Sequence, residues 1–103
     1  MSEELEKLRE KLGKSPGNLL FRFSYAQKLF SSGYESEALG QLQICVNERE
    51  DWMFAHLLKA KLEISLGKNK DATISLKKTI ALAKAQNHED PLMEATELLK
   101  SLV

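Results

Sequence analysis

The sequence predicts an all-α protein built from repeated pairs of helices, and three observations support this prediction. The segment from Gly33 to Leu39 returns in altered form as the segment from Gly67 to Thr73, and a 34-residue interval is typical of stacked helical units. Apolar residues recur at helical spacing through most of the chain. No interval has alternating β-branched residues over a length that would favour a sheet.

Length and charge predict one domain, residues 1–103, with no electrostatic preference for nucleic acid or an anionic membrane. The 103 residues carry 15 basic and 15 acidic side chains, so no net charge would attract a polyanion. The single cysteine, Cys45, excludes an internal disulfide and a cysteine-based zinc site, and it favours a reducing compartment. The charged N-terminus does not fit a signal peptide, and no stretch has the roughly 18 apolar residues of a membrane span. We therefore expect a cytoplasmic protein that binds neither nucleic acid nor membrane.

Turn and capping residues divide the chain into six predicted helices. The expected ranges are 2–12, 19–32, 36–48, 52–66, 69–86 and 92–102. Side chains suited to capping the helix starts are those of Ser2, Asn18, Asp51, Asn69 and Asp90. Glycines at 13, 33 and 67 end three of the helices, and Pro91 suits a first helical turn.

Pairing residues 18–50 with residues 52–84 places identical or similar residues at the positions where two helices must approach closely. The five identities are Ala26/Ala60, Ser31/Ser65, Gly33/Gly67, Ala38/Ala72 and Leu42/Leu76. In this pattern the chain resembles the tetratricopeptide repeat family, whose unit has a W-x2-L-G-x2-Y, A-x3-F, P signature. The small and apolar positions of the signature are matched by Ala26, Ala38, Leu42 and Cys45, and in the second copy by Ala60, Ala72, Leu76 and Thr79.

The chain also departs from that signature. The tryptophan, leucine and tyrosine positions hold Arg22, Tyr25 and Leu29 in the first copy and His56, Lys59 and Glu63 in the second. The closing proline is replaced by Glu50 and Lys84, although Pro16 falls in phase with it. The resemblance implies a right-handed superhelical α-α solenoid. It would consist of an N-terminal half-repeat helix (2–12), repeat 1 (19–50), repeat 2 (52–86) and a C-terminal capping helix (91–102).

The resemblance also implies a protein-interaction function. The first helix of each repeat, helix A, would line a concave surface that binds a peptide or an amphipathic helix of a protein partner. The residues that would form this surface are Leu20, Phe23, Gln27, Phe30, Phe54, Leu57, Lys61 and Ile64. Two alternatives stay open: the apolar members belong to the core, or the surface is buried in a homodimer. The lysine and asparagine clamp with which some family members bind acidic chaperone tails is missing, since only Lys61 could grip a carboxylate.

We expect no enzyme activity, cofactor or metal. The sequence has no glycine-rich phosphate loop, nucleophile elbow or paired carboxylates at a helix end. His56 and His88 lack convincing metal-ligand spacing, and His56 and Glu63 are expected on a solvated helix face. Cys45 occupies a small buried position of its repeat, which predicts an inert thiol.

Overall fold

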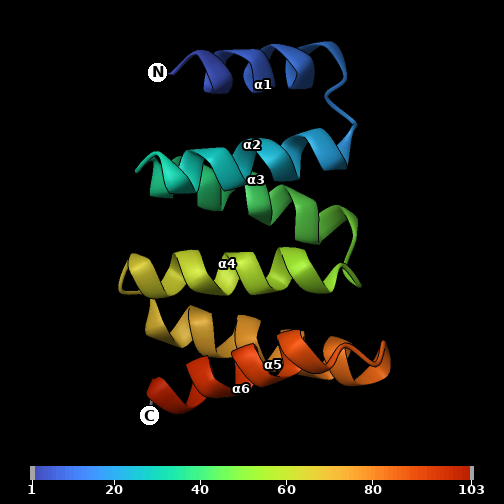
Figure 1. The fold of residues 1–103 in the computed structure, drawn as a ribbon, viewed down its shortest axis with the longest axis vertical. Helices are drawn as coiled ribbons and strands as arrows, with labels where there is room; N and C mark the ends of the chain where they lie inside the picture. The colour runs from blue at the N-terminus through green and yellow to red at the C-terminus, as the bar shows by residue number, and fades with distance from the viewer. Residues whose placement is uncertain (1, 103) are drawn as a thin grey trace.

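The computed structural model describes residues 2–102, which form six helices and no strand. Residues 1 and 103, the two ends of the expected domain, lie outside the described part. The helices are α1 (Glu3–Lys14), α2 (Leu19–Ser31), α3 (Glu35–Glu48), α4 (Met53–Ser65), α5 (Asn69–Ala85) and α6 (Glu89–Ser101). They stack along the longest axis of the molecule, which measures 38 Å (Figure 1). The prediction of an all-α helical-repeat solenoid is confirmed.

Helices α2, α4 and α6 run in one direction, and α3 and α5 run back between them (Figure 1). Each helix packs against the next along the chain, and α4 also contacts both α2 and α6. We call the surface formed by α2, α4 and α6 the A-helix face, because α2 and α4 are the first helices of the two repeats. Helices α3 and α5 lie on the opposite side of the molecule.

Both repeat glycines end their helices in the left-handed conformation, with φ of +90° at Gly33 and +75° at Gly67. The next residue donates its N–H back into the helix, from Tyr34 to the Leu29 carbonyl and from Lys68 to the Glu63 carbonyl. This arrangement is a Schellman motif. Asn87, with φ of +59°, ends α5 in the same way.

These turns explain which capping predictions are right. Ser2 and Asn18 accept hydrogen bonds from the backbone N–H groups of Leu5 and Phe21, as expected. Asn69 and Asp90 are wrong as caps, since the caps are Lys68 and His88, which bond no N–H through their side chains. The residue that completes each Schellman motif is also the N-cap of the next helix, so the cap comes earlier in the chain than Asn69 and Asp90.

Two other helix ends differ from the expected ones. The cap of α4 is Trp52 and not Asp51, and its side chain forms no capping hydrogen bond. Helix α1 continues through Gly13 to Lys14, because the backbone at Gly13 stays right-handed. A glycine that keeps helical angles weakens a helix without ending it.

The core is formed by the apolar side chains that the helices turn towards one another. Four apolar residues of α3 are buried. The two repeats pack round separate clusters that meet at α4. Helix α6 covers the end of the second cluster with Ala95, which is fully buried, and with half-buried leucines. The inward residues of α3 are Ala38, Leu42, Cys45 and Val46.

Candidate functional site

The A-helix face brings the first turns of α2, α4 and α6 to the same side of the molecule, at the right in Figure 1. Leu20 lies in the first turn of α2 and Phe54 in the first turn of α4, at equivalent positions of the two repeats. Both are exposed, Leu20 by 64% and Phe54 by 49% of its surface. Since neither residue is needed to fill the core, this pair is the most accessible apolar part of the predicted site.

One aromatic contact involves Phe54, and a second joins α2 to the start of α4. The ring of Phe54 meets the ring of His88 edge to face at 5.8 Å between centroids. Phe23 packs against Trp52 with centroids 4.9 Å apart, and the Arg49 guanidinium lies 4.9 Å from the Trp52 ring. Aromatic and cation–π contacts of this kind hold rings in fixed orientations. The first contact orients the ring of Phe54, and the second ties α2 to α4.

The remaining apolar residues of the predicted surface are less accessible. Leu57 is only 5% exposed, because α6 closes over it in the second core cluster. Phe23, Phe30 and Ile64 are half-buried and pack against the core clusters. A ligand can reach only the outer edges of these three side chains. Leu57 belongs to the second core cluster, beneath the A-helix face.

The polar residues of the predicted surface differ in availability. Gln27 on α2 is exposed. Lys61 on α4 forms an ion pair with Glu94 on α6. This ion pair links α4 to α6. It neutralises Lys61, the one residue of the predicted surface that could have bound a carboxylate. The surface therefore offers a ligand the Gln27 amide and apolar side chains.

His88 and Trp52 are contributors that the sequence reasoning missed. Leu20, Phe54 and His88 follow one another at intervals of 34 residues. Continuing the repeat phase beyond residue 84 would therefore have placed His88 beside Phe54. Trp52 is the N-cap of α4, and the comparison of the two copies pairs it with Asn18. The two residues are unlike, so the repeat gave no signal for Trp52.

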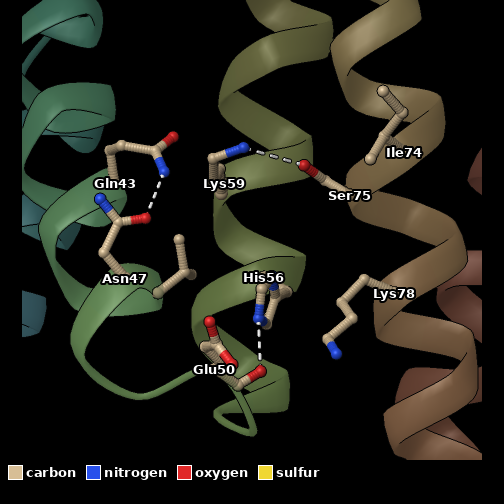
Figure 2. Close-up of a pocket in the computed structure, with 9 residues that line it drawn as sticks. Gln43, Asn47, Glu50, His56, Lys59, Ile74, Ser75 and Lys78 are labelled. Carbon is tan, nitrogen blue, oxygen red and sulfur yellow. Dashed lines mark hydrogen bonds between the residues drawn. The ribbon is translucent and has the colours of Figure 1, made fainter.

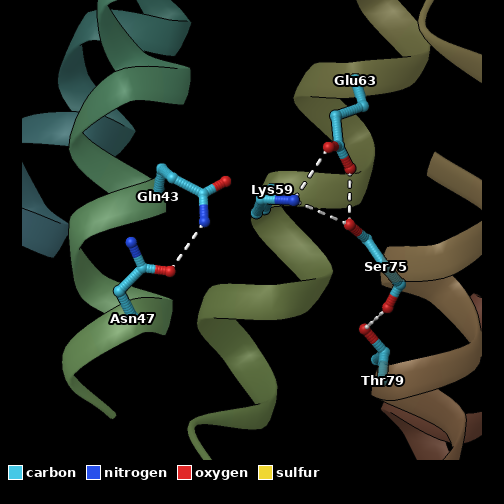
Figure 3. Close-up of polar contacts among 6 residues, drawn as sticks. All are labelled: Gln43, Asn47, Lys59, Glu63, Ser75 and Thr79. Carbon is cyan, nitrogen blue, oxygen red and sulfur yellow. Dashed lines mark hydrogen bonds and ion pairs between the residues drawn. The ribbon is translucent and has the colours of Figure 1, made fainter. Parts of the chain in front are cut away.

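The expectation that Glu63 lies on a solvated helix face is wrong. Glu63 is 3% exposed, and its carboxylate accepts hydrogen bonds from Lys59 Nζ at 2.9 Å and from Ser75 Oγ at 2.6 Å (Figure 3). Lys59 Nζ also donates to Ser75 Oγ at 3.1 Å, and Thr79 Oγ1 donates to the Ser75 carbonyl. The polar side of α4 thus faces α5 and not solvent, since α4 is the central helix of the stack.

Known proteins of the same shape confirm the architecture. A tetratricopeptide repeat domain protein from Salinibacter ruber, solved by NMR, superposes with a TM-score of 0.76 at 21% identity, over 84% of this chain and 88% of that one. The chain has the tetratricopeptide-repeat fold. A crystal structure of a Salinibacter ruber tetratricopeptide repeat domain protein gives the same TM-score at 20% identity, over 82% of this chain and 96% of that one.

A protein from Bordetella parapertussis covers more of this chain. It matches 99% of the chain and 89% of its own, with a TM-score of 0.84 and 20% identity. The match therefore extends over the flanking helices α1 and α6 as well as over the two repeats of the tetratricopeptide-repeat fold. No family model matches the sequence, and no curated protein matches it.

Two further features bear on the chemistry of the described chain. Within residues 2–102, no three or more His, Cys, Asp or Glu side chains gather closely enough to hold a metal ion. No helix in the same range combines the length and the apolar character needed to cross a membrane.

Proposed function

We propose that this protein is an interaction module, an adaptor or assembly scaffold, whose A-helix face binds an amphipathic helix or apolar peptide of a protein partner. The observation that carries the proposal is the exposure of Leu20 and Phe54 at equivalent positions of successive repeats. Isolated exposed apolar residues are ordinary, but two in register on one face form a surface that a partner can cover.

The spacing of the two side chains suits a helical ligand. Helices α2 and α4 contact each other, and packed helices lie about 8–10 Å apart. Two turns of a ligand helix rise about 11 Å, so apolar residues at i and i+7 of the ligand could cover Leu20 and Phe54 together. Helix-in-groove recognition uses such spacings. Gln27 is exposed on the same helix as Leu20 and can hydrogen-bond a polar edge of the ligand.

The test is binding of a fluorescent amphipathic peptide with leucines at i, i+3 and i+7, measured by anisotropy. Leu20→Glu and Phe54→Glu should each weaken binding at least about tenfold, since each places a charge in an apolar contact. Ile74→Glu is the matched control, because Ile74 is 69% exposed on α5, on the other side of the molecule. Equal loss in all three variants, or no loss in the first two, would reject the A-helix face.

A homodimer that buries the same face is the alternative use of these residues. It would show as a doubled mass that Leu20→Glu returns to that of the monomer. The proposal assigns the protein no catalytic step, cofactor or nucleic-acid partner, in keeping with its balanced charge. A cytoplasmic location is proposed from the single reduced cysteine.

A further inference from the structure

The A-helix face changes from apolar to acidic between α4 and α6. Leu20 and Phe54 give the first turns of α2 and α4 an exposed apolar residue, and neither of these turns contains an acidic residue. The first turn of α6 carries Glu89 and Asp90 instead. Carboxylates there stabilise α6 through its dipole, and they also add negative charge to one edge of the apolar surface.

Asp90 lies on the side of α6 that belongs to the A-helix face. The ion pair with Lys61 places Glu94 on this face. Asp90 precedes Glu94 by four residues, and residues four apart lie on the same side of a helix. The ring contact between His88 and Phe54 brings the start of α6 next to the exposed apolar pair. Asp90 therefore flanks Phe54 on the side of α6.

The carboxylate of Asp90 has no cation to balance it. Asp90 is exposed and takes part in none of the ion pairs between residues 2–102. Lys61 is neutralised by Glu94. Glu89 and Lys84 line the same small pocket at the turn between α5 and α6, so their opposite charges offset each other. One negative charge is left at the α6 edge of the A-helix face.

The groove on the opposite side of the molecule, between α3, α4 and α5, has no such imbalance (Figure 2). Glu50 and Lys78 both line this groove, and Glu63 neutralises Lys59. Opposite charges in one groove offer a charged ligand little net attraction. A ligand that is selected by its charge would therefore distinguish the A-helix face from this groove.

A second copy of the chain does not supply the charge that Asp90 lacks. The lysine that the A-helix face carries, Lys61, is already paired with Glu94, and Lys28 of α2 is paired with Glu4 of α1. A two-fold dimer through this face would bring two Asp90 carboxylates into the contact without cations for them, and a charge that loses water without gaining a partner opposes association. The charge therefore favours a different, basic partner.

We propose that the partner of the A-helix face is a basic amphipathic helix, with a lysine or arginine next to Asp90. This inference rests on the proposed function, because it uses the same face and the same apolar pair. Helix α4 contacts both α2 and α6, so each step across the face is one interhelical distance of about 8–10 Å, or about two turns of a ligand helix. The basic residue is expected about seven residues beyond the leucine that covers Phe54.

Three peptides test the charge preference. Each has leucines at i, i+3 and i+7, and they differ only in carrying lysine, glutamine or glutamate at both i−7 and i+14, so that either direction of binding brings one of these residues to Asp90. Anisotropy with the full chain at low salt should show about threefold to fivefold tighter binding of the lysine peptide than of the glutamine peptide, the effect of an exposed ion pair. High salt should remove this difference.

Asp90→Lys should invert the preference, so that the glutamate peptide binds more tightly than the lysine peptide. Asp71→Lys is the matched control. Asp71 lies in the first turn of α5, so its replacement loses a similar helix-dipole contribution, but on the opposite side of the molecule. This variant should keep the wild-type order of the three peptides. Circular dichroism verifies that both variants stay helical.

The outcomes separate this inference from the proposed function. Equal binding of the three peptides, with Leu20→Glu still weakening the glutamine peptide, would overturn the basic partner and leave the proposed function in place. The same order of peptides in Asp90→Lys as in the wild type would also overturn the inference, because the charge preference would then come from another residue. Failure of all three peptides to bind would reject both proposals.

Discussion

Cys45 shows how the position of one residue in the repeat determines its chemistry. It lies on the inner side of α3, fully buried beside Val46 and Ala55. Burial raises the pKa of its thiol from the ordinary 9.0 to about 11, because the thiolate would lose its hydration. The sequence predicted an inert thiol at this position, and the burial supports that prediction.

We predict that an aromatic disulfide reagent at neutral pH labels Cys45 at least about a hundredfold more slowly in the folded protein than in urea, because labelling requires opening of the core. The unfolded chain loses its proton first as the pH rises, so folding stability should fall between about pH 9 and pH 11. Labelling at the same rate in both states would contradict a buried thiol.

The burial of the Lys59–Glu63 ion pair is the residue-scale feature that the sequence predicted least well. A helical wheel shows that His56, Lys59 and Glu63 share one side of a helix, but it does not show which neighbours that side meets. Because α4 has α3 on one flank and α5 on the other, its polar side is covered. The serine that makes this burial tolerable, Ser75, lies on a different helix and could not be paired with Glu63 from spacing alone.

Glu63→Ala should lower the free energy of unfolding by about 3 kcal/mol, because it leaves the Lys59 ammonium buried without its carboxylate. Replacing both residues, Lys59→Met with Glu63→Leu, should restore most of this loss. Urea denaturation of the three proteins measures both effects. A loss of less than about 1 kcal/mol for Glu63→Ala would mean that water solvates the pair.

At the scale of the elements, the turns determine where the helices start. Each Schellman motif ends one helix, and its last residue is the N-cap of the next, so the two helices are joined by a short turn. The sequence indicated the glycine turns correctly, since glycine favours the left-handed region. It indicated the start of α6 less well, since Asn87 takes the role of glycine and the motif then moves the helix start ahead of Asp90.

Gly67→Ala should lower the free energy of unfolding by about 1–2 kcal/mol, the penalty of a Cβ in the left-handed conformation. Apart from its two chain neighbours, no described residue has a heavy atom within 4 Å of the added Cβ, so backbone strain and not a clash would be the cause. Asn87→Gly should change stability by less than about 0.5 kcal/mol, because asparagine already tolerates this region. A neutral Gly67→Ala, measured by urea denaturation, would mean that the turn can relax.

Helix α6 is the element on which the second repeat depends. It packs along α5 and covers Leu57 and Leu76. Deleting residues 90–103 should therefore lower the melting temperature by at least about 10 °C, since several kcal/mol of apolar burial are lost. Thermal unfolding followed by circular dichroism gives the answer. An unchanged melting temperature would contradict the capping role of α6.

At the scale of the whole molecule, the outer helices are polar and the exposed apolar surface is concentrated on the sides of the stack. Helix α1 turns lysines and glutamates outward, and α6 exposes Glu97 and Lys100, with Met93 as an apolar exception. This pattern is expected of terminal units in a repeat stack. It leaves the Leu20/Phe54 pair of the A-helix face among the largest accessible apolar features.

The global architecture was the most predictable property, because one repeat interval constrains every helix pair at once. The accessible part of the predicted site was less predictable. Repeat phase places Leu57 and Leu20 on the same face, but α6 packs over Leu57, whereas Leu20 is 64% exposed. Which residues of the A-helix face stay exposed depends on how the neighbouring helix packs. The position of a residue in the repeat does not contain that information.

The most direct test of the account is the solution mass measured by light scattering over a wide range of concentrations. If the A-helix face is open for a partner, the protein should stay at 11.7 kDa throughout. A mass that doubles with concentration, and that Leu20→Glu returns to 11.7 kDa while Ile74→Glu does not, would contradict the account by showing that a second copy already covers the face.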